Sequence, residues 1–207
     1  MRIFIDDTRL DDAPDAPTAI ALAREHIDGA DRLIIDINAD GEPAPDAILD
    51  GTDDGASIAE LRFTTADTGT FLSETVHAAK ESLDLIRKDQ TTAAEQIRAG
   101  EMEDAMHALR AIMEGWQGVR DVVDQVAQLA GADAATLEAH SEAGPEDGAE
   151  SGQAIIADLG AALTEIRDTL AQEDWASLGD VVEYDLATLA DRWDALLDAL
   201  IERAARR

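Results

Sequence analysis

From Thr70 to the end of the chain, apolar residues recur every three or four positions. This spacing places them along one face of an α-helix, and such a face must be buried against another element. The most regular run steps by four, three, four, three and four, which is the heptad pattern of a seam between helices. It consists of Val182, Leu186, Leu189, Trp193, Leu196 and Leu200. The second part of this chain is therefore predicted to fold as helices packed side by side.

Three more helices are predicted before this one. The first covers about residues 70–98 and ends at Gly100, the second begins near Met102 and ends at Gly131, and the third follows an acidic stretch. Their apolar stripes are, in order, Leu72, Val76, Ala79, Leu83, Ile86 and Ile97; Met102, Met106, Leu109, Met113, Trp116, Val119, Val123, Val126 and Leu129; and Ile156, Leu159, Leu163, Ile166 and Leu170. Short turns join antiparallel neighbours, so residues 70–207 are expected to form an antiparallel four-helix bundle.

Two features interrupt this helical pattern. Residues around 132–150 are rich in Gly, Asp and Glu, so they are predicted to be a mobile acidic connection with one short helix from Ala134 to His140. Gly115 and Gly118 lie inside the second helix, where each glycine costs about 1 kcal/mol relative to alanine. That cost indicates either another helix packed closely against this turn or a kink that opens a groove.

Residues 1–66 follow the period of two that is typical of strands. A strand is predicted at "MRIFIDD", a weak second strand near Thr8 to Leu10, a strand at "DRLIIDI" and a last strand at "AELRF". Between the second and third strands, Thr18 is a candidate N-cap for a helix of about three turns that Gly29 ends. Pro14 and Pro17 are expected to break pairing ahead of this helix.

This order of elements resembles the ubiquitin-like β-grasp fold. In the resemblance, "MRIFIDD" opens the sheet, "RLIIDINADGEPA" takes the place of the central hairpin, "PDAILDG" is the short turn and "AELRF" closes the sheet. It covers about a third of the chain and implies a small domain over residues 1–66. A ubiquitin-type modifier ends in a free Gly-Gly tail, whereas here "TTADTGTF" runs into a helix. We therefore expect an α+β protein whose first domain is a fixed interaction module.

The charge of the chain excludes several classes of partner. There are 46 acidic residues against 16 basic ones, and the formal net charge is −30. Nucleic acid and anionic membrane surfaces would be repelled. The acidity has two interpretations: a surface that recruits basic proteins or cations, or solubility in a salty cytoplasm. Acidic residues are spread over the whole chain with no single acidic tail, which favours the second interpretation.

Other expectations follow from residues that the sequence lacks. There is no cysteine, so disulfides and thiol chemistry are excluded. The beginning of the sequence has no long apolar segment of the signal-peptide type, and no stretch approaches the roughly 20 apolar residues of a membrane span. A cytoplasmic protein is expected.

One stretch raises the question of a metal site. Asp36, Asn38, Asp40 and Gly41 match positions 1, 3, 5 and 6 of a calcium loop. Position 12, which needs a bidentate Glu, is Ala47. Asp-Gly after an alternating apolar run is also a favoured hairpin turn. We predict a hairpin and no metal, with Asp36, Asn38 and Asp40 as the ligands in the alternative that the loop binds calcium.

Catalytic motifs are weak. Glu74 and His77 give one Glu-x-x-His, but a di-iron bundle needs two such motifs. Ser73, His77 and Glu81 share one helix face, yet nothing in the sequence supplies an oxyanion hole. No catalytic residue, no enzyme activity and no cofactor are therefore expected.

The function expected from these patterns is that of a non-enzymatic protein–protein interaction module: an adaptor, assembly factor or chaperone. Its partner would be a protein that offers a basic or helical segment, and self-association into a homo-oligomer is a further possibility. Trp175, Tyr184, Glu183 and Asp185 are the candidate partner-binding residues, because exposed Trp and Tyr are frequent interface anchors. The alternative is a metal-binding protein that uses Asp36, Asn38 and Asp40 or carboxylates of the bundle.

Overall fold

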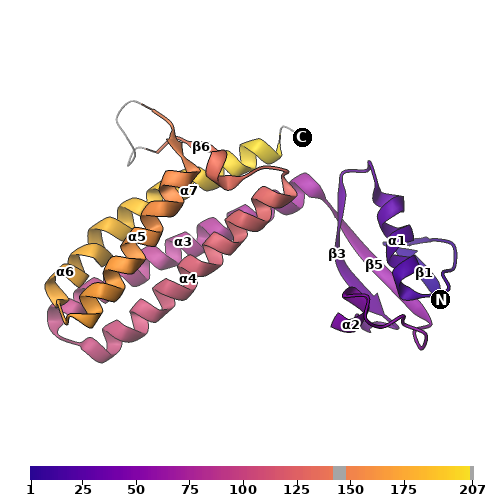
Figure 1. Cartoon of the computed structure of the whole chain (residues 1–207), viewed down its shortest axis with the longest axis horizontal. Helices are drawn as coiled ribbons and strands as arrows, with labels where there is room; N and C mark the ends of the chain where they lie inside the picture. The colour runs from indigo at the N-terminus through magenta and orange to yellow at the C-terminus, as the bar shows by residue number, and fades with distance from the viewer. Residues whose placement is uncertain (142–147, 206–207) are drawn as a thin grey trace. The chain divides into compact units, whose positions relative to one another are not determined.

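The computed structural model describes residues 1–141 and 148–205. The chain divides into two compact units, Met1–Phe71 and Leu72–Arg207. The first unit contains a five-stranded sheet and the second contains several long helices (Figure 1). The predicted α+β class is confirmed.

The first unit is built on a mixed sheet with the strand order β2-β1-β5-β3-β4. Strands β1 and β5 at its centre are parallel, with Ile3 opposite Leu61, and the other neighbours are antiparallel. The elements are β1 (Arg2–Ile5), β2 (Thr8–Arg9), α1 (Ala16–Ile27), β3 (Arg32–Ala39), β4 (Glu42–Pro43), α2 (Asp46–Leu49) and β5 (Glu60–Asp67).

The core of this unit lies between one face of the sheet and α1. Alternate residues of β1 and β5 point into it, as a period of two requires, and small alanines of α1 allow the helix to lie close to the sheet. The buried cluster consists of Ile3, Ile5, Ala13, Ala16, Ala19, Ala23, Ile48, Leu61 and Phe63.

Helix α1 begins three residues earlier than the sequence predicted. Its N-cap is Asp15, not Thr18, and the Asp15 carboxylate accepts a hydrogen bond of 2.8 Å from the backbone N–H of Thr18. Pro17 lies in the first turn, where the absence of an N–H group costs nothing. The predicted start was wrong because Pro17 begins the helix and does not break the chain ahead of it.

Asp6 joins three strands of the sheet. It lies in the left-handed region at φ 49°, in the turn between β1 and β2. Its carboxylate accepts hydrogen bonds of 2.8 Å from both the backbone N–H and the hydroxyl of Thr65, and it pairs with Arg32 at 3.3 Å. The backbone and hydroxyl hydrogen bonds from Thr65, together with the Arg32 charge, lower the pKa of the Asp6 carboxyl below its ordinary value.

The hairpin predicted at Asp40-Gly41 is confirmed. Both residues have positive φ, 50° and 92°, as a tight turn between β3 and β4 requires. The Asp40 carboxylate also accepts hydrogen bonds from the backbone N–H groups of Ala59 and Glu60, the closest at 2.9 Å. Asp40 therefore ties the turn to the start of β5.

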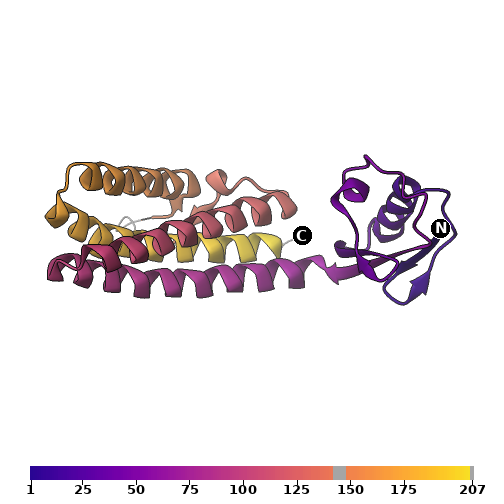
Figure 2. The ribbon, with the colours of Figure 1, turned by 90° about the horizontal axis from the view of Figure 1, so that it is seen from below.

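The long helices of the second unit lie side by side (Figure 2). Two short strands and a 3-10 turn precede the third long helix. The elements are α3 (Thr68–Ala99), α4 (Met102–Leu129), η1 (Ala134–Thr136), β6 (Glu138–Ala139), β7 (Glu150–Ser151), α5 (Gly152–Ala171), α6 (Trp175–Asp180), η2 (Val181–Asp185) and α7 (Leu186–Ala204). Gly100 and Gly131, at φ 78° and 61°, end the first two long helices as predicted.

The stripes predicted for the first and last helices are confirmed. Every residue named for them is at most 5% exposed. Between α4 and α7, the rings of Trp116 and Trp193 meet edge to face with centroids 5.7 Å apart, and both residues are fully buried. Aromatic pairs in this geometry contribute about 0.5–1.5 kcal/mol beyond the area that they bury.

The acidic connection differs from its prediction. No helix extends from Ala134 to His140, because the 3-10 turn ends at Thr136 and β6 follows it. Strands β6 and β7 pair, with Glu138 opposite Ser151 and Ala139 opposite Glu150. Residues 142–147, at the centre of the predicted mobile connection, lie outside the described residues.

Cations of α3 face α7. Lys80 contacts Asp198 at 2.6 Å and Asp194 at 3.3 Å, and Arg87 contacts Asp191 at 2.9 Å. Arg98 pairs with Glu183 of η2, which is one turn of π-helix between α6 and α7. These pairs lie along the interface that the buried stripes of α3 and α7 form.

Candidate partner-binding groove between α4 and α5

Helices α4 and α5 each carry two apolar faces, where the sequence predicted one. The predicted stripes combined residues of both faces. The buried apolar face of α4 includes Ala105, Leu109, Ile112 and Trp116, and that of α5 includes Ile155, Leu159, Ala162 and Ile166. The methionines predicted to lie in the core, Met106 and Met113, are instead 46% and 38% exposed.

The second, partly exposed apolar faces of α4 and α5 line a groove between the two helices. One cavity of about 590 Å³ is lined by Met106, Leu109, Met113, Leu163, Ile166 and Leu170, with polar residues at its margins. A second cavity of about 470 Å³ continues along the helices and reaches Trp116, Ile156 and Leu159. The cavities share Arg110, Met113 and Leu163, so they form one continuous groove.

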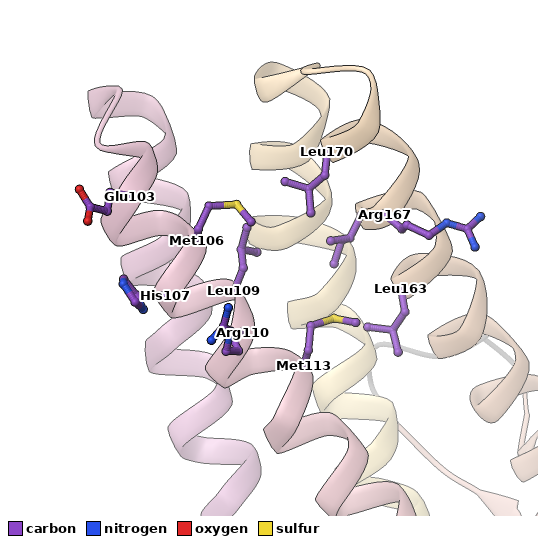
Figure 3. Close-up of a pocket in the computed structure, with 10 residues that line it drawn as sticks. Glu103, Met106, His107, Leu109, Arg110, Met113, Leu163, Arg167 and Leu170 are labelled. Carbon is purple, nitrogen blue, oxygen red and sulfur yellow. The ribbon is translucent and has the colours of Figure 1, made fainter.

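The apolar side chains of the two walls approach each other. Figure 3 shows Met106 and Met113 extending from α4 toward α5, where Leu170 and Leu163 lie. Met106 and Met113 are seven residues apart, and Leu163 and Leu170 repeat this spacing on the other wall, preceded by Ile156. The walls run for about 14 residues, or about 21 Å at 1.5 Å per residue.

Charged residues border the groove unevenly. Arg110 stands between the two methionines, one turn from each, while the guanidinium of Arg167 extends from α5 away from α4 (Figure 3). Arg167 pairs with its neighbour Asp168 at 2.9 Å, but no ion pair joins Arg110 to any described residue. The acidic residues at the margins are Glu103, Glu114, Asp121 and Asp124. A second arginine of α4, Arg120, lines the same cavity as Asp121 and Asp124.

The structure places the predicted partner-binding residues outside this groove. Trp175, at the start of α6, is 36% exposed, and Tyr184, in η2, is 59% exposed. They are nine residues apart, about two and a half helical turns, so they do not share one face. Asp185 is exposed, whereas Glu183 is half-buried and paired with Arg98.

The candidate metal ligands are engaged with protein groups. Asn38 donates a hydrogen bond to the carboxylate of Asp36, and Asp40 accepts the backbone hydrogen bonds described above. His77 is exposed, and its Nδ1 lies 2.7 Å from the carbonyl oxygen of Ser73. Within residues 1–141 and 148–205, no group of three or more His, Asp or Glu side chains is arranged to hold a metal ion.

A smaller apolar surface lies on the first unit. Ile35, at a register shift in β3, is 46% exposed, and Leu49 at the end of α2 is 49% exposed. Together with Ile34, Ile37, Pro43 and Ala44 they line a hollow of about 300 Å³. Strand β4 pairs only with Asn38 and Ala39, so the rest of β3 forms an open edge of the sheet.

The sequence contains a signal for the groove that the predicted stripes do not reflect. Adjacent residues such as Ile155-Ile156 and Ile112-Met113 are both apolar, and neighbouring positions on a helix are about 100° apart. A helix with such pairs presents two apolar faces and needs two neighbours. In α4 and α5, no other element among residues 1–141 and 148–205 covers the second apolar face along the groove.

Comparisons with known proteins bear on the helical unit. A family profile described as "Domain of unknown function (DUF8042)" matches residues 74–196, which is more than half of the chain and includes both walls of the groove. No curated protein and no solved structure matches the chain. Among the helices that the structure describes, none combines the length and the hydropathy that a membrane span requires.

Proposed function

The chain belongs to the family described as Domain of unknown function (DUF8042), and we propose that it is a non-enzymatic interaction module that binds a helical segment of a partner protein in the groove between α4 and α5. In cellular terms this is the role of an adaptor, assembly factor or chaperone. The observation that carries the proposal is the pair of half-exposed apolar stripes, Met106 with Met113 and Ile156 with Leu163 and Leu170, that face one groove.

The spacing of these stripes favours a helix as the occupant. Apolar residues seven apart are the a or d positions of a helix–helix seam. Two such seams, on walls that run for about 21 Å, match the length of about four helical turns. Flexible methionine side chains also adapt to different partners, as they do at other helix-binding surfaces.

We infer two finer assignments of fold in support of this role. The order β2-β1-β5-β3-β4, with parallel central strands and α1 on one face, supports a ubiquitin-like β-grasp for the first unit. Helices α3, α4 and α5 with the α6–α7 segment support a four-helix bundle for the second. A β-grasp with an open β3 edge beside Ile35 and Leu49 would supply a second contact surface.

Binding of amphipathic helical peptides tests the proposed function. The probes are labelled peptides of about 16 residues with Leu, Ile or Met at heptad positions, measured by fluorescence anisotropy. We expect saturable binding to the wild-type chain and a loss of at least about tenfold in affinity for the double variant Met106→Asp/Met113→Asp, because it places two charges among the apolar contacts.

The matched control is Leu85→Asp. Leu85 is 59% exposed on α3 and lines neither cavity, so this variant should bind the peptides like the wild type. Circular dichroism checks that all variants are folded. Equal binding by the double variant and the wild type, or no saturable binding by the wild type, would contradict the proposed site.

A further inference from the structure

Arg110 occupies the middle of the groove. It is four residues after Met106 and three before Met113, so the three side chains share one face of α4. It lines both cavities, and its side chain is exposed. Glu114 is one turn further along the helix, but no carboxylate of the described chain forms an ion pair with Arg110.

Most Lys and Arg residues of the described chain, which has 46 acidic and 16 basic residues in all, form ion pairs, whereas Arg110 is among the few that do not, together with Arg24, Lys88, Arg120 and Arg203. Lys80, Arg87 and Arg98 of α3 all pair with acidic residues of the α7 side of the bundle. Arg192 pairs with both Glu150 and Asp158. Arg120, the other cation of the groove on α4, also forms no ion pair within the described residues, but it shares its cavity with the carboxylates of Asp121 and Asp124, whereas Arg110 lies between two methionines.

A helix laid in the groove would cover Arg110. The apolar contacts of Met106 and Met113 on either side would remove water from the guanidinium, and burial of an unpaired charge is costly. An occupant that supplies a carboxylate would offset this cost and would gain a hydrogen-bonded ion pair. An occupant without one would leave the guanidinium buried and unpaired.

We propose that the partner helix carries an Asp or Glu beside its apolar stripe, at the level of Arg110, and that this carboxylate pairs with the Arg110 guanidinium. The inference rests on the proposed function and deepens it by giving the chemistry of the partner. It replaces the basic segment expected from the overall acidity with a helix that is acidic at one defined position. A second copy of this chain is disfavoured as the occupant, because two chains of net charge −30 repel each other.

Two peptides of identical composition test the inference. Each has the same heptad stripe and one Glu, placed beside the stripe at its centre in the first peptide and on the opposite, outward face in the second. Equal net charge removes general repulsion from the comparison. We expect the wild-type chain to bind the first peptide about tenfold more tightly at low salt, with the difference reduced at high salt.

Substitutions of Arg110 test whether this residue causes the preference for the first peptide. Arg110→Gln should bring the two affinities together, and Arg110→Glu should reverse the preference. Lys88→Glu makes the same change of charge at an exposed position of α3 outside the groove, and it should keep the wild-type preference.

The outcomes separate this inference from the proposed function. If the wild type binds both peptides equally while Met106→Asp/Met113→Asp abolishes binding, the groove binds helices but the role of Arg110 is refuted. If neither peptide binds, and sedimentation shows the wild type as a dimer that Met113→Asp dissociates, the occupant is a second copy and both proposals fall. Tight binding of a fatty acid in place of either peptide would also refute both.

Discussion

Two glycines one turn apart in α4 experience different surroundings. A Cβ on Gly115 would lie 2.7 Å from Cγ1 and 3.0 Å from Cδ1 of Ile86, so α3 packs closely against this turn. A Cβ on Gly118 would meet no atom within 4 Å. The sequence predicted that either close packing of another helix or a kink explains these two glycines. In the structure another helix packs closely at Gly115 but not at Gly118.

Substitution by alanine should therefore have opposite effects at the two positions. Gly118→Ala should stabilise the protein by up to about 1 kcal/mol, because alanine favours the helix. Gly115→Ala gains the same propensity, but it forces Ile86 to move, and overpacking costs about 1–3 kcal/mol. We expect a net loss of stability at Gly115, measured as the free energy of unfolding in urea.

The double variant Gly115→Ala/Ile86→Ala identifies the cause. Removal of the Ile86 side chain should make the added methyl group of residue 115 favourable. If Gly115→Ala is as destabilising in the Ile86→Ala background as in the wild type, contact with Ile86 is not the reason for glycine at this position.

Among the elements, α3 and α7 were predicted well and α4 and α5 were not. Every stripe residue assigned to α3 and α7 is buried, and in α7 both members of adjacent apolar pairs such as Leu196-Leu197 are buried, so the choice of stripe did not matter there. In α4 and α5, pairs such as Ala105-Met106 and Ala162-Leu163 allow two stripes that differ by one position. Which stripe enters the core depends on where the neighbouring helices lie, and that information is not local to either helix.

Arg192 holds three elements together. From α7, its Nε donates a hydrogen bond of 2.8 Å to Glu150 of β7, and its terminal nitrogen contacts Asp158 of α5 at 2.6 Å. The side chains of Arg192 and Glu150 are only 12% and 14% exposed. The hydrogen bond to Glu150 outweighs desolvation, so the pKa of Arg192 is raised further above its ordinary value.

Loss of this cation should loosen the β6–β7 ladder. Arg192→Met keeps most of the apolar stem but leaves Glu150 without its partner, and we expect a loss of about 1.5–3 kcal/mol in the free energy of unfolding. Arg167→Met is the control, because its pair with Asp168 is exposed and should contribute less than about 1 kcal/mol. Similar losses in the two variants would argue against a structural role for Arg192.

At the scale of the whole molecule, charge acts against compactness. A net charge of −30 on 207 residues produces mutual repulsion that the unfolded chain relieves by expanding. The ion pairs between α3 and α7 use several of the scarce cations to offset this repulsion where two acidic helices meet. The uneven pairing of cations could not be predicted from composition, because it depends on which helix faces are neighbours.

Added salt should therefore stabilise the protein at neutral pH. Screening weakens the repulsion more than it weakens the few ion pairs, so we expect the melting temperature to rise by several degrees between about 0.05 M and about 0.5 M NaCl. KCl of equal ionic strength should have the same effect. A fall in melting temperature would show that the ion pairs dominate. If CaCl2 raises the melting temperature more than NaCl of equal ionic strength does, the result would favour the metal-binding alternative.

The π-helical turn η2 has a consequence for how this molecule tolerates changes of length. The buried residues Leu178, Val182 and Leu186 are each four positions apart in the sequence. From Leu186 to Leu200, by contrast, the spacing of the buried seam alternates between three and four. A π-helical turn holds one residue more than an α-helical turn, and the wider turn takes up the extra rotation. In evolutionary terms, η2 is equivalent to a one-residue insertion absorbed within a helix, so a deletion here would restore an unbroken α-helix and leave the seam of α7 in register.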